Sequence, residues 1–175
     1  MSLPVLTTER LVLRPATPDD TSRLWQLWVL PDVRRFMFDD KAMPREEAAA
    51  WLGVQAAHGV RGLGVWAIEE TAGTFVGHVS LVPADVIAAL DPTWVGEVEF
   101  GIALDPEFWG RGYAAEALDA VLAYGLGAAG LARILGAYHE PNVASRKLQE
   151  EAGFVRLGVI RGPVHPIVIG EVRTG

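Results

Sequence analysis

Two glycines at alternate positions, Gly110 and Gly112, stand where the sequence predicts that a strand turns into a helix. Residues without a side chain let the backbone pass close to a ligand, and the free N–H groups of a helix start lie at its positive dipole end. Such a turn suits a phosphate or a diphosphate. It is not a Walker loop, because no Gly-Lys-Ser/Thr follows, and it lacks the third glycine of a dinucleotide fingerprint. Taken alone, the pair fits equally well a tight turn that binds nothing.

A second polar helix start follows the next predicted strand. Asn142 can cap the helix that begins there, and Ser145 lies in its first turn. An isolated asparagine at this place would be a helix cap and nothing more. Together with the glycine turn, however, it places two polar helix starts at the ends of consecutive strands. The two helix N-termini could therefore bind one long polar ligand together.

The order of the elements around these segments predicts the fold class. Apolar alternation and turn residues predict strands over residues 11–14, 65–70, 75–82, 95–104, 131–139, 154–160 and 164–172. Helical periodicity and helix-start residues predict helices over 17–30, 44–59, 114–126 and 142–152, with a short helical piece around 33–37. Residues 83–94 are expected to form a loop. The pattern is that of a mixed α/β domain with a mainly antiparallel sheet and a βαβα crossover in its second half.

Length, charge and cysteine content exclude several classes of protein. The 175 residues suit a single domain over 1–175, since no repeat, linker or low-complexity tract divides them. A net charge of −7, from 15 basic and 22 acidic residues, argues against a nucleic-acid partner and favours a cationic one. The longest uncharged stretch, 71–84, is too short to cross a membrane. Because the chain lacks cysteines and a signal peptide, we expect a cytoplasmic protein without disulfides or thiol chemistry.

Four segments together resemble a known family. They are TERLVLRP at 8–15 with the acids at 19 and 20, EFGIALDPEFWGRGYAAEAL at 99–118, PNVAS at 141–145 and EAGF at 151–154. In residue type, order and spacing the sequence resembles the GCN5-related N-acetyltransferase (GNAT) family, and in particular the branch of ribosomal-protein N-terminal acetyltransferases. The resemblance extends from Thr8 to about Ile160.

The resemblance implies a GNAT-type central sheet, flanked by helices and splayed between its fourth and fifth strands, here 95–104 and 131–139. Acetyl-CoA would lie in the splay as cosubstrate, with its pantetheine on the backbone of the first of these strands and its diphosphate on the glycine turn. No metal is implied. The cofactor-binding residues implied are Ile102, Ala103, Leu104, Gly110, Arg111, Gly112, Tyr113, Ala114, Ala115 and Asn142. Trp109 stands where the family often has Gln or Arg, so Arg111 is the side chain expected to reach a phosphate, unless it is only a solvated surface arginine.

Acetyl transfer needs a deprotonated amine, a polarised thioester carbonyl and a group that receives the leaving thiolate. By the resemblance, Glu99 matches the glutamate that serves this branch as a general base, acting through water. Glu97 lies two residues earlier on the same strand face and is the reserve candidate, although either carboxylate could simply face solvent. Ser145 matches the residue that stabilises the thiolate. Tyr138 is expected to pack rather than act.

The resemblance places the acceptor opposite the cofactor, against the first two helices and the loop before the last strand. The residues there are Trp25, Trp28, Phe36, Met37, Phe38 and 161–165, of which the two tryptophans are expected to be core. His58, His78, His139 and His165 are too scattered to suggest a metal site. We expect a primary amine as acceptor, with a protein N-terminal α-amine ranked above an aminoglycoside or polyamine. A non-catalytic acyl-CoA-binding module is the alternative of another class, and self-association into a homodimer is left open.

Overall fold

The computed structural model describes residues 3–174, apart from the side chain of Phe38, and its centre is one eight-stranded sheet. The strand order is β1-β2-β3-β4-β5-β6-β8-β7, and every neighbouring pair is antiparallel except β5 and β6. The strands are β1 (Leu6–Thr7), β2 (Leu11–Pro15), β3 (Gly64–Glu70), β4 (Phe75–Pro83), β5 (Val98–Leu104), β6 (Arg133–His139), β7 (Val155–Arg161) and β8 (Pro166–Arg173). The mainly antiparallel α/β fold is therefore confirmed. The ends of the predicted domain, Met1, Ser2 and Gly175, lie outside the described residues.

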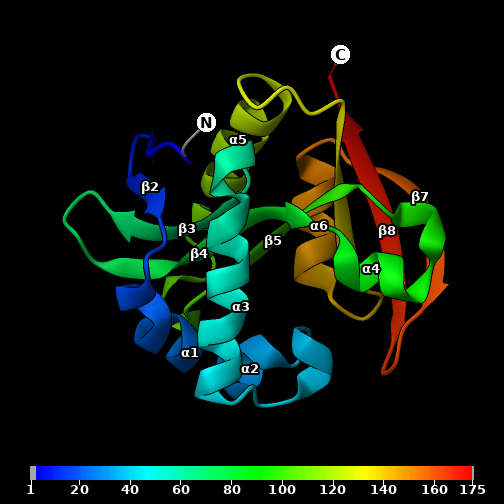
Figure 1. Cartoon of the computed structure of the whole chain (residues 1–175), viewed down its shortest axis with the longest axis horizontal. Helices are drawn as coiled ribbons and strands as arrows, with labels where there is room; N and C mark the ends of the chain where they lie inside the picture. The colour runs from blue at the N-terminus through cyan, green and yellow to red at the C-terminus, as the bar shows by residue number, and fades with distance from the viewer. Residues whose placement is uncertain (1–2, 175) are drawn as a thin grey trace.

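Helices cover both faces of the sheet, as Figure 1 shows. One face carries α1 (Thr21–Val29), α2 (Pro31–Arg34), α3 (Arg45–Ala57) and α4 (Asp85–Leu90), and the other carries α5 (Tyr113–Leu126) and α6 (Val143–Glu151). The largest apolar cluster lies between α5 and the sheet and contains Val79, Leu81, Phe100 and Leu118. Burial of these side chains supplies the main force that holds α5 in place. The start of α5 is thereby fixed relative to β5.

The two strands that pair in parallel soon part. β5 pairs with β4 along its whole length, but it pairs with β6 only at Glu99 with Leu135 and at Phe100 with Gly136. From Gly101 to Leu104, the edge of β5 that faces β6 has no strand partner in the described part of the chain. The expected splay is therefore present, and backbone groups on this edge are left without partners in the sheet.

A short turn connects the parted strand to α5. The side chain of Asp105 accepts a hydrogen bond of 3.0 Å from the backbone N–H of Glu107 and so caps a 3-10 turn. Trp109 then donates from Nε1 to the carbonyl of Leu104 at 2.8 Å. Gly110 and Gly112 follow with φ angles of +74° and +81°, values that side chains other than glycine rarely tolerate. The glycine pair is thus required by the backbone path itself.

The predicted helix start at Thr17 and Pro18 is confirmed, although its first turn is a 3-10 turn over Pro18–Asp20 and α1 begins at Thr21. The carboxylate of Asp20 accepts from the N–H of Thr17 at 2.8 Å and pairs with Arg14 at 2.8 Å. Other local predictions were wrong. The predicted loop 83–94 contains α4 and a 3-10 turn over Pro92–Trp94. The predicted helical piece around 33–37 ends at Arg34, and β1 was not predicted at all.

No helix within residues 3–174 is both long enough and apolar enough to span a lipid bilayer.

We predict that Leu118→Ala lowers the free energy of unfolding by about 3 kcal/mol, because the side chain is fully buried beneath α5 and its removal leaves a cavity. Urea denaturation followed by circular dichroism measures the change. The neighbouring exposed residue supplies the control, since Asp119→Ala should change stability by no more than about 0.5 kcal/mol. Equal losses in the two variants would contradict the assignment of this face of α5 to the core.

Candidate active site

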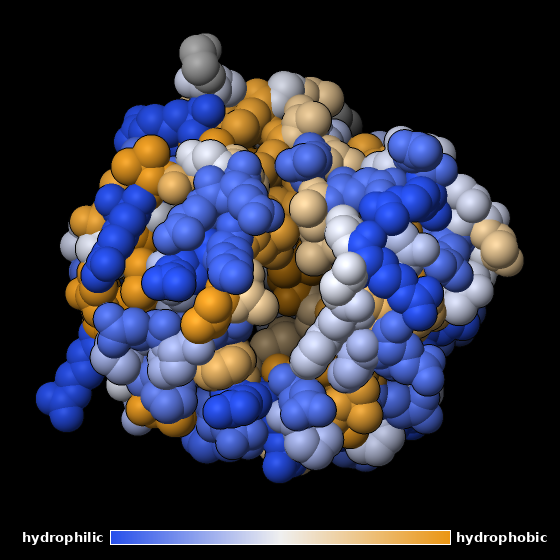
Figure 2. Space-filling model, turned by 180° about the vertical axis from the view of Figure 1, so that it is seen from behind, coloured by the Kyte–Doolittle hydropathy of each residue, from blue (hydrophilic) through white to orange (hydrophobic). Residues whose placement is uncertain are grey.

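A cavity of about 530 Å³ occupies the gap between β5 and β6. It is lined by α2 and the residues after it on one face of the sheet and by the starts of α5 and α6 on the other. Figure 2 shows the α5 and α6 side hollowed along its middle, with apolar side chains in the floor and polar ones along the rims. The predicted residues that line the cavity are Ile102, Ala103, Leu104, Gly110, Gly112, Tyr113, Ala114, Asn142 and Ser145. Glu99, Arg111 and Ala115 are not among its lining residues.

The start of α5 is able to bind an anion. The first N–H of the helix to bond back along the chain is that of Glu116, which donates to the carbonyl of Gly112 at 3.1 Å. The N–H groups of Tyr113, Ala114 and Ala115 precede that bond and have no partner inside the helix. They lie at the positive end of a 14-residue helix. The cavity therefore has one end suited to a phosphate group.

Arg10 braces this helix start, and the sequence analysis gave it no role. Its Nε donates to Glu116 at 2.6 Å, its Nη1 donates to the carbonyl of Arg111 at 2.9 Å, and its guanidinium lies 4.7 Å from the ring centre of Tyr113. Thr8 donates a further hydrogen bond to Glu116 at 2.6 Å. These contacts neutralise the acid in the first turn of α5 and hold a cation beside Gly112. Arg10 and Glu116 lie 106 positions apart, so no local pattern could have found the pair.

Arg111 takes a different position from the one expected of a phosphate ligand. Its guanidinium lies over the ring of Phe108 at 5.0 Å, and the residue is exposed. Arg10 is therefore the better-placed cation in this structure, whereas a phosphate contact by Arg111 stays a prediction.

The start of α6 forms the opposite wall. Asn142 accepts a hydrogen bond on its side-chain oxygen from the N–H of Ser145 at 3.1 Å, which confirms the predicted helix cap. Both residues line the cavity. The hydroxyl of Ser145 lies 3.5 Å from Nε2 of Gln149, one turn further along the helix. The two polar helix starts thus meet at one cavity.

Glu99 pairs with Leu135, one residue before β5 and β6 part after Phe100. It is half-buried, and no hydrogen-bond donor in the described part of the chain reaches its carboxylate. Burial, with the negative charge of Asp85 at the start of α4 as a second cause, raises the pKa of Glu99 to about 7. A carboxylate with that pKa is a competent general base at neutral pH.

Glu97 differs from Glu99 in both position and charge state. It precedes β5, and its carboxylate accepts two hydrogen bonds from Arg133, one of them 2.8 Å long. These bonds hold the pKa of Glu97 below its usual value. Arg133 also pairs with Glu171 at 2.8 Å, so it ties β6 to β8. The reserve base candidate therefore belongs to a structural ion-pair network.

The opposite end of the cavity is aromatic. Phe36 and Met37 line it, as the acceptor side implied by the resemblance requires, and Tyr138 lines it as well, although we expected that side chain to pack. The ring of Phe36 lies 6.2 Å from that of His139 and 6.3 Å from that of His165, and the two imidazoles are 5.6 Å apart. The expectation that all four histidines are scattered was therefore wrong for this pair.

The remaining predictions on this side concern the tryptophans and metal binding. Trp28 is buried and donates to Nδ1 of His78 at 3.2 Å, whereas Trp25 is partly buried and donates to the carbonyl of Met43 at 2.8 Å. Both pack in the cluster around α1 and α3, as expected. Residues 3–174 contain no group of three or more histidine or acidic side chains arranged to hold a metal ion. The side chain of Phe38, also predicted on this side, lies outside the described part of the chain.

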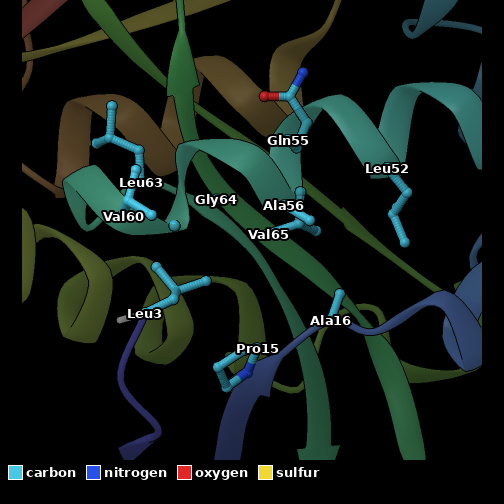
Figure 3. Close-up of a pocket in the computed structure, with 11 residues that line it drawn as sticks. Leu3, Pro15, Ala16, Leu52, Gln55, Ala56, Val60, Leu63, Gly64 and Val65 are labelled. Carbon is cyan, nitrogen blue, oxygen red and sulfur yellow. The ribbon is translucent and has the colours of Figure 1, made fainter. Parts of the chain in front are cut away.

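A second hollow, of about 470 Å³, lies between the N-terminal segment and the end of α3. Its walls are almost entirely apolar, and Figure 3 shows Leu3 and Pro15 opposite Val60 and Leu63. The amide of Gln55 points away from Leu3 and Pro15 in the same view. This hollow carries no titratable or nucleophilic side chain among its described lining residues. Chemistry is therefore assigned to the cavity between β5 and β6.

Comparisons with known proteins identify the family of this chain. A family model described as an acetyltransferase (GNAT) domain matches residues 10–155. An uncharacterized N-acetyltransferase, YoaA, of Bacillus subtilis is 30% identical over 168 residues, which cover 90% of this chain and 86% of that protein. An FsC-acetyl coenzyme A-N(2)-transacetylase of Aspergillus fumigatus is 29% identical over 177 residues, covering 97% and 74% respectively.

Solved structures give the same fold. RimL, a ribosomal L7/L12 alpha-N-protein acetyltransferase in complex with coenzyme A, superposes with a TM-score of 0.77 at 18% identity, covering 97% of this chain and 98% of that one. The family match spans the glycine turn, the parted strand and both polar helix starts. The chain therefore belongs to the GNAT acetyltransferase family and is an acetyl-CoA-dependent N-acyltransferase.

Proposed function

We propose that this enzyme acetylates the α-amine of a protein N-terminus inside the cavity between β5 and β6. The observation behind the proposal is that the unpaired edge of β5 and the starts of α5 and α6 all open onto one space. A ligand with an anionic end, an amide-rich arm and a reactive tip fits that succession of surfaces, and acetyl-CoA has this chemistry.

Acetyl-CoA would be held along the cavity by backbone groups more than by side chains. The N–H groups at the start of α5 would bind its diphosphate, assisted by the positive charge of Arg10. The free edge of β5 from Gly101 to Leu104 would bind the amides of the pantetheine arm, with Asn142 on the other side. Ile102, Ala103, Gly110 and Ala114 line the same path. The thioester would then lie where the strands part, next to Glu99.

The transfer itself needs two groups of this chain. Glu99 would accept, through a water molecule, the proton that the acceptor amine must lose before it attacks. The nitrogen forms a bond to the acetyl carbonyl carbon, and the carbon–sulfur bond breaks with its electron pair staying on sulfur. The second proton, which the nitrogen must lose to become an amide, would pass to the thiolate and give the free thiol of coenzyme A. The hydroxyl of Ser145 would donate a hydrogen bond to that thiolate, because a group of such weak acidity stabilises the negative charge better than it gives up a proton.

Support for the acceptor comes from the RimL relative and from charge. RimL is described as acting on a protein α-amine, and the net charge of −7 would steer a cationic partner at low salt. The FsC-related enzyme is described as an N(2)-transacetylase, so a small-molecule amine is the second candidate. Arg161, at the end of β7, would repel a polycation that came close to it.

We predict that Glu99→Gln lowers kcat about 100-fold and leaves the affinity for acetyl-CoA nearly unchanged, because the general base is lost. In the wild type, kcat should rise with pH through about 7 as Glu99 ionises. A separate increase in rate near about pH 8 should follow the deprotonation of the free acceptor amine. A thiol-release assay between pH 5.5 and 9 measures both limbs.

Glu97→Gln provides the matched comparison. It should lower the melting temperature by breaking the bonds to Arg133, and the rise of kcat near pH 7 should remain.

The dependence of stability on pH supplies an independent check on Glu99. Its folded pKa of about 7 exceeds its ordinary value of 4.5, so the wild type should lose stability as pH rises from about 4.5 to 7, and Glu99→Gln should not. Unchanged turnover in Glu99→Gln would contradict its role as base.

We predict that Arg10→Met weakens binding of coenzyme A roughly five- to tenfold, since it removes the cation beside Gly112 and leaves the charge of Glu116 without its ion-pair partner at the helix start. Calorimetry at low salt measures the affinity. Binding of acetyl-pantetheine, which lacks the diphosphate, should not change, and Arg10→Met with Glu116→Gln should recover part of the loss. Arg156→Met on β7 is the exposed control. An equal loss for both ligands would contradict the diphosphate assignment.

We predict that short peptides with free N-termini are acetylated and that the same peptides, acetylated beforehand, are not. Spermidine and an aminoglycoside run beside them should give much lower kcat/KM, because Arg161 would repel them. Arg161 pairs with Pro166, next to His165, whose ring lies 6.3 Å from that of Phe36. Mass spectrometry of the products identifies the modified nitrogen. Turnover of the small polycations alone would overturn the N-terminal proposal in favour of the small-molecule one, and binding without turnover of any amine would leave only an acyl-CoA-binding module.

A further inference from the structure

One buried amide close to the cavity has no structural explanation so far. Gln149, on α6, is 3% exposed, and its Oε1 accepts no hydrogen bond from the part of the chain that the structure describes. Burying an amide oxygen without a partner destabilises a folded protein, and an apolar side chain of the same size would avoid that cost. A residue of this kind calls for a functional reason.

The sheet beneath Gln149 leaves room for this amide. Gly136 on β6 and Gly170 on β8 are direct cross-strand partners, and the amide lies over them. A Cβ at Gly136 would collide with the side chain of Gln149 and would come within 2.8 Å of the ring of Phe100. Phe154 packs against Phe100 with ring centres 5.2 Å apart. The slot is therefore fixed in shape, and it fixes the amide within it.

The other end of the amide reaches the site. Gln149 follows Ser145 by four residues, so the two side chains lie on the same face of α6. Nε2 of Gln149 donates to the hydroxyl oxygen of Ser145 over 3.5 Å. Catalytic hydrogen bonds are often long in ligand-free sites and shorten when charge develops. This hydrogen bond connects the buried amide to the cavity, which Ser145 lines.

We propose that Gln149 is a positioning residue that orients the hydroxyl of Ser145 toward the sulfur of coenzyme A. Because Nε2 occupies a lone pair of the Ser145 oxygen, the hydroxyl proton is directed away from Gln149 and into the cavity. Without that donor, a serine in the first turns of a helix is free to donate to a backbone carbonyl one turn earlier. The inference rests on the proposed function, in which Ser145 stabilises the departing thiolate. Gln149 itself touches neither substrate.

Titration of bound coenzyme A tests the inference without any acceptor amine. Thiolate absorbance near 240 nm is followed against pH for the wild type, Gln149→Met, Ser145→Ala and the double variant. The wild type should lower the pKa of the bound thiol relative to free coenzyme A. Each single variant should raise it by on the order of one unit, the effect of losing one hydrogen bond to a charged group. The double variant should match Ser145→Ala, because Gln149 acts only through Ser145.

Turnover and stability separate positioning from packing. Gln149→Met should lower kcat about tenfold with an unchanged KM for acetyl-CoA and an unchanged kcat limb near pH 7. Its melting temperature should not fall, since methionine fills the same volume and removes the unsatisfied oxygen. Gln149→Leu serves as the second variant if the methionine variant does not fold. Glu150→Met, the next residue of α6 and exposed, is the matched control and should behave as the wild type.

The outcomes distinguish this inference from the proposed function. If Ser145→Ala raises the thiol pKa and lowers kcat while Gln149→Met and Gln149→Leu do neither, the positioning role is overturned and the role of Ser145 stands. If Ser145→Ala changes neither quantity, both are overturned. A Gln149 variant with a lower melting temperature, a higher KM and an unchanged pKa of the bound thiol would show that Gln149 only packs. That result would also overturn the proposal.

Discussion

The brief pairing of β5 with β6 is the constraint on which the rest of the structure depends. Two strands that stay paired satisfy each other's backbone groups, whereas strands that part after Phe100 and Gly136 leave groups that need other partners. Trp109 supplies one by donating to the carbonyl of Leu104. The remaining edge opens onto the cavity, and the starts of α5 and α6 line the same opening. In the proposed function, ligand binding uses hydrogen-bonding capacity that the sheet has left unused.

Two carboxylates near this opening show how environment divides similar groups. Glu97 and Glu99 are two residues apart, yet the pKa of Glu97 is lowered by hydrogen bonds from Arg133, and that of Glu99 is raised by burial and by Asp85. Their environments have pushed the two pKa values apart, which is how proteins assign different roles to the same chemistry. Arg10 and Glu116 complete the arrangement by tying the N-terminal strands to α5, whose start we propose as the diphosphate site.

Sequence reasoning found what is encoded locally and missed what depends on distant partners. Gly110, Gly112 and the cap at Asn142 were predictable, because a positive φ and a helix start each demand particular residue types. The helix α4 was missed, because six residues with one buried side chain show no period. Arg10 was missed because its partner lies 106 positions away. Tyr138 was placed near the site, but a strand pattern does not tell which side chains border a gap. The splay itself came only from the family resemblance.

A cavity that is walled by α2 on one face of a sheet and by α5 and α6 on the other is an opening through the plane of the sheet. Two ligands can enter it from opposite faces and meet where β5 and β6 separate, and neither blocks the exit of the other. Such an arrangement favours a sequential mechanism, in which both substrates bind in one ternary complex. It disfavours a ping-pong mechanism, in which the protein first forms an acyl-enzyme intermediate. The chain has no cysteine that could carry such a group. The topology of the sheet thus bears on the kinetic order of the reaction as well as on its chemistry.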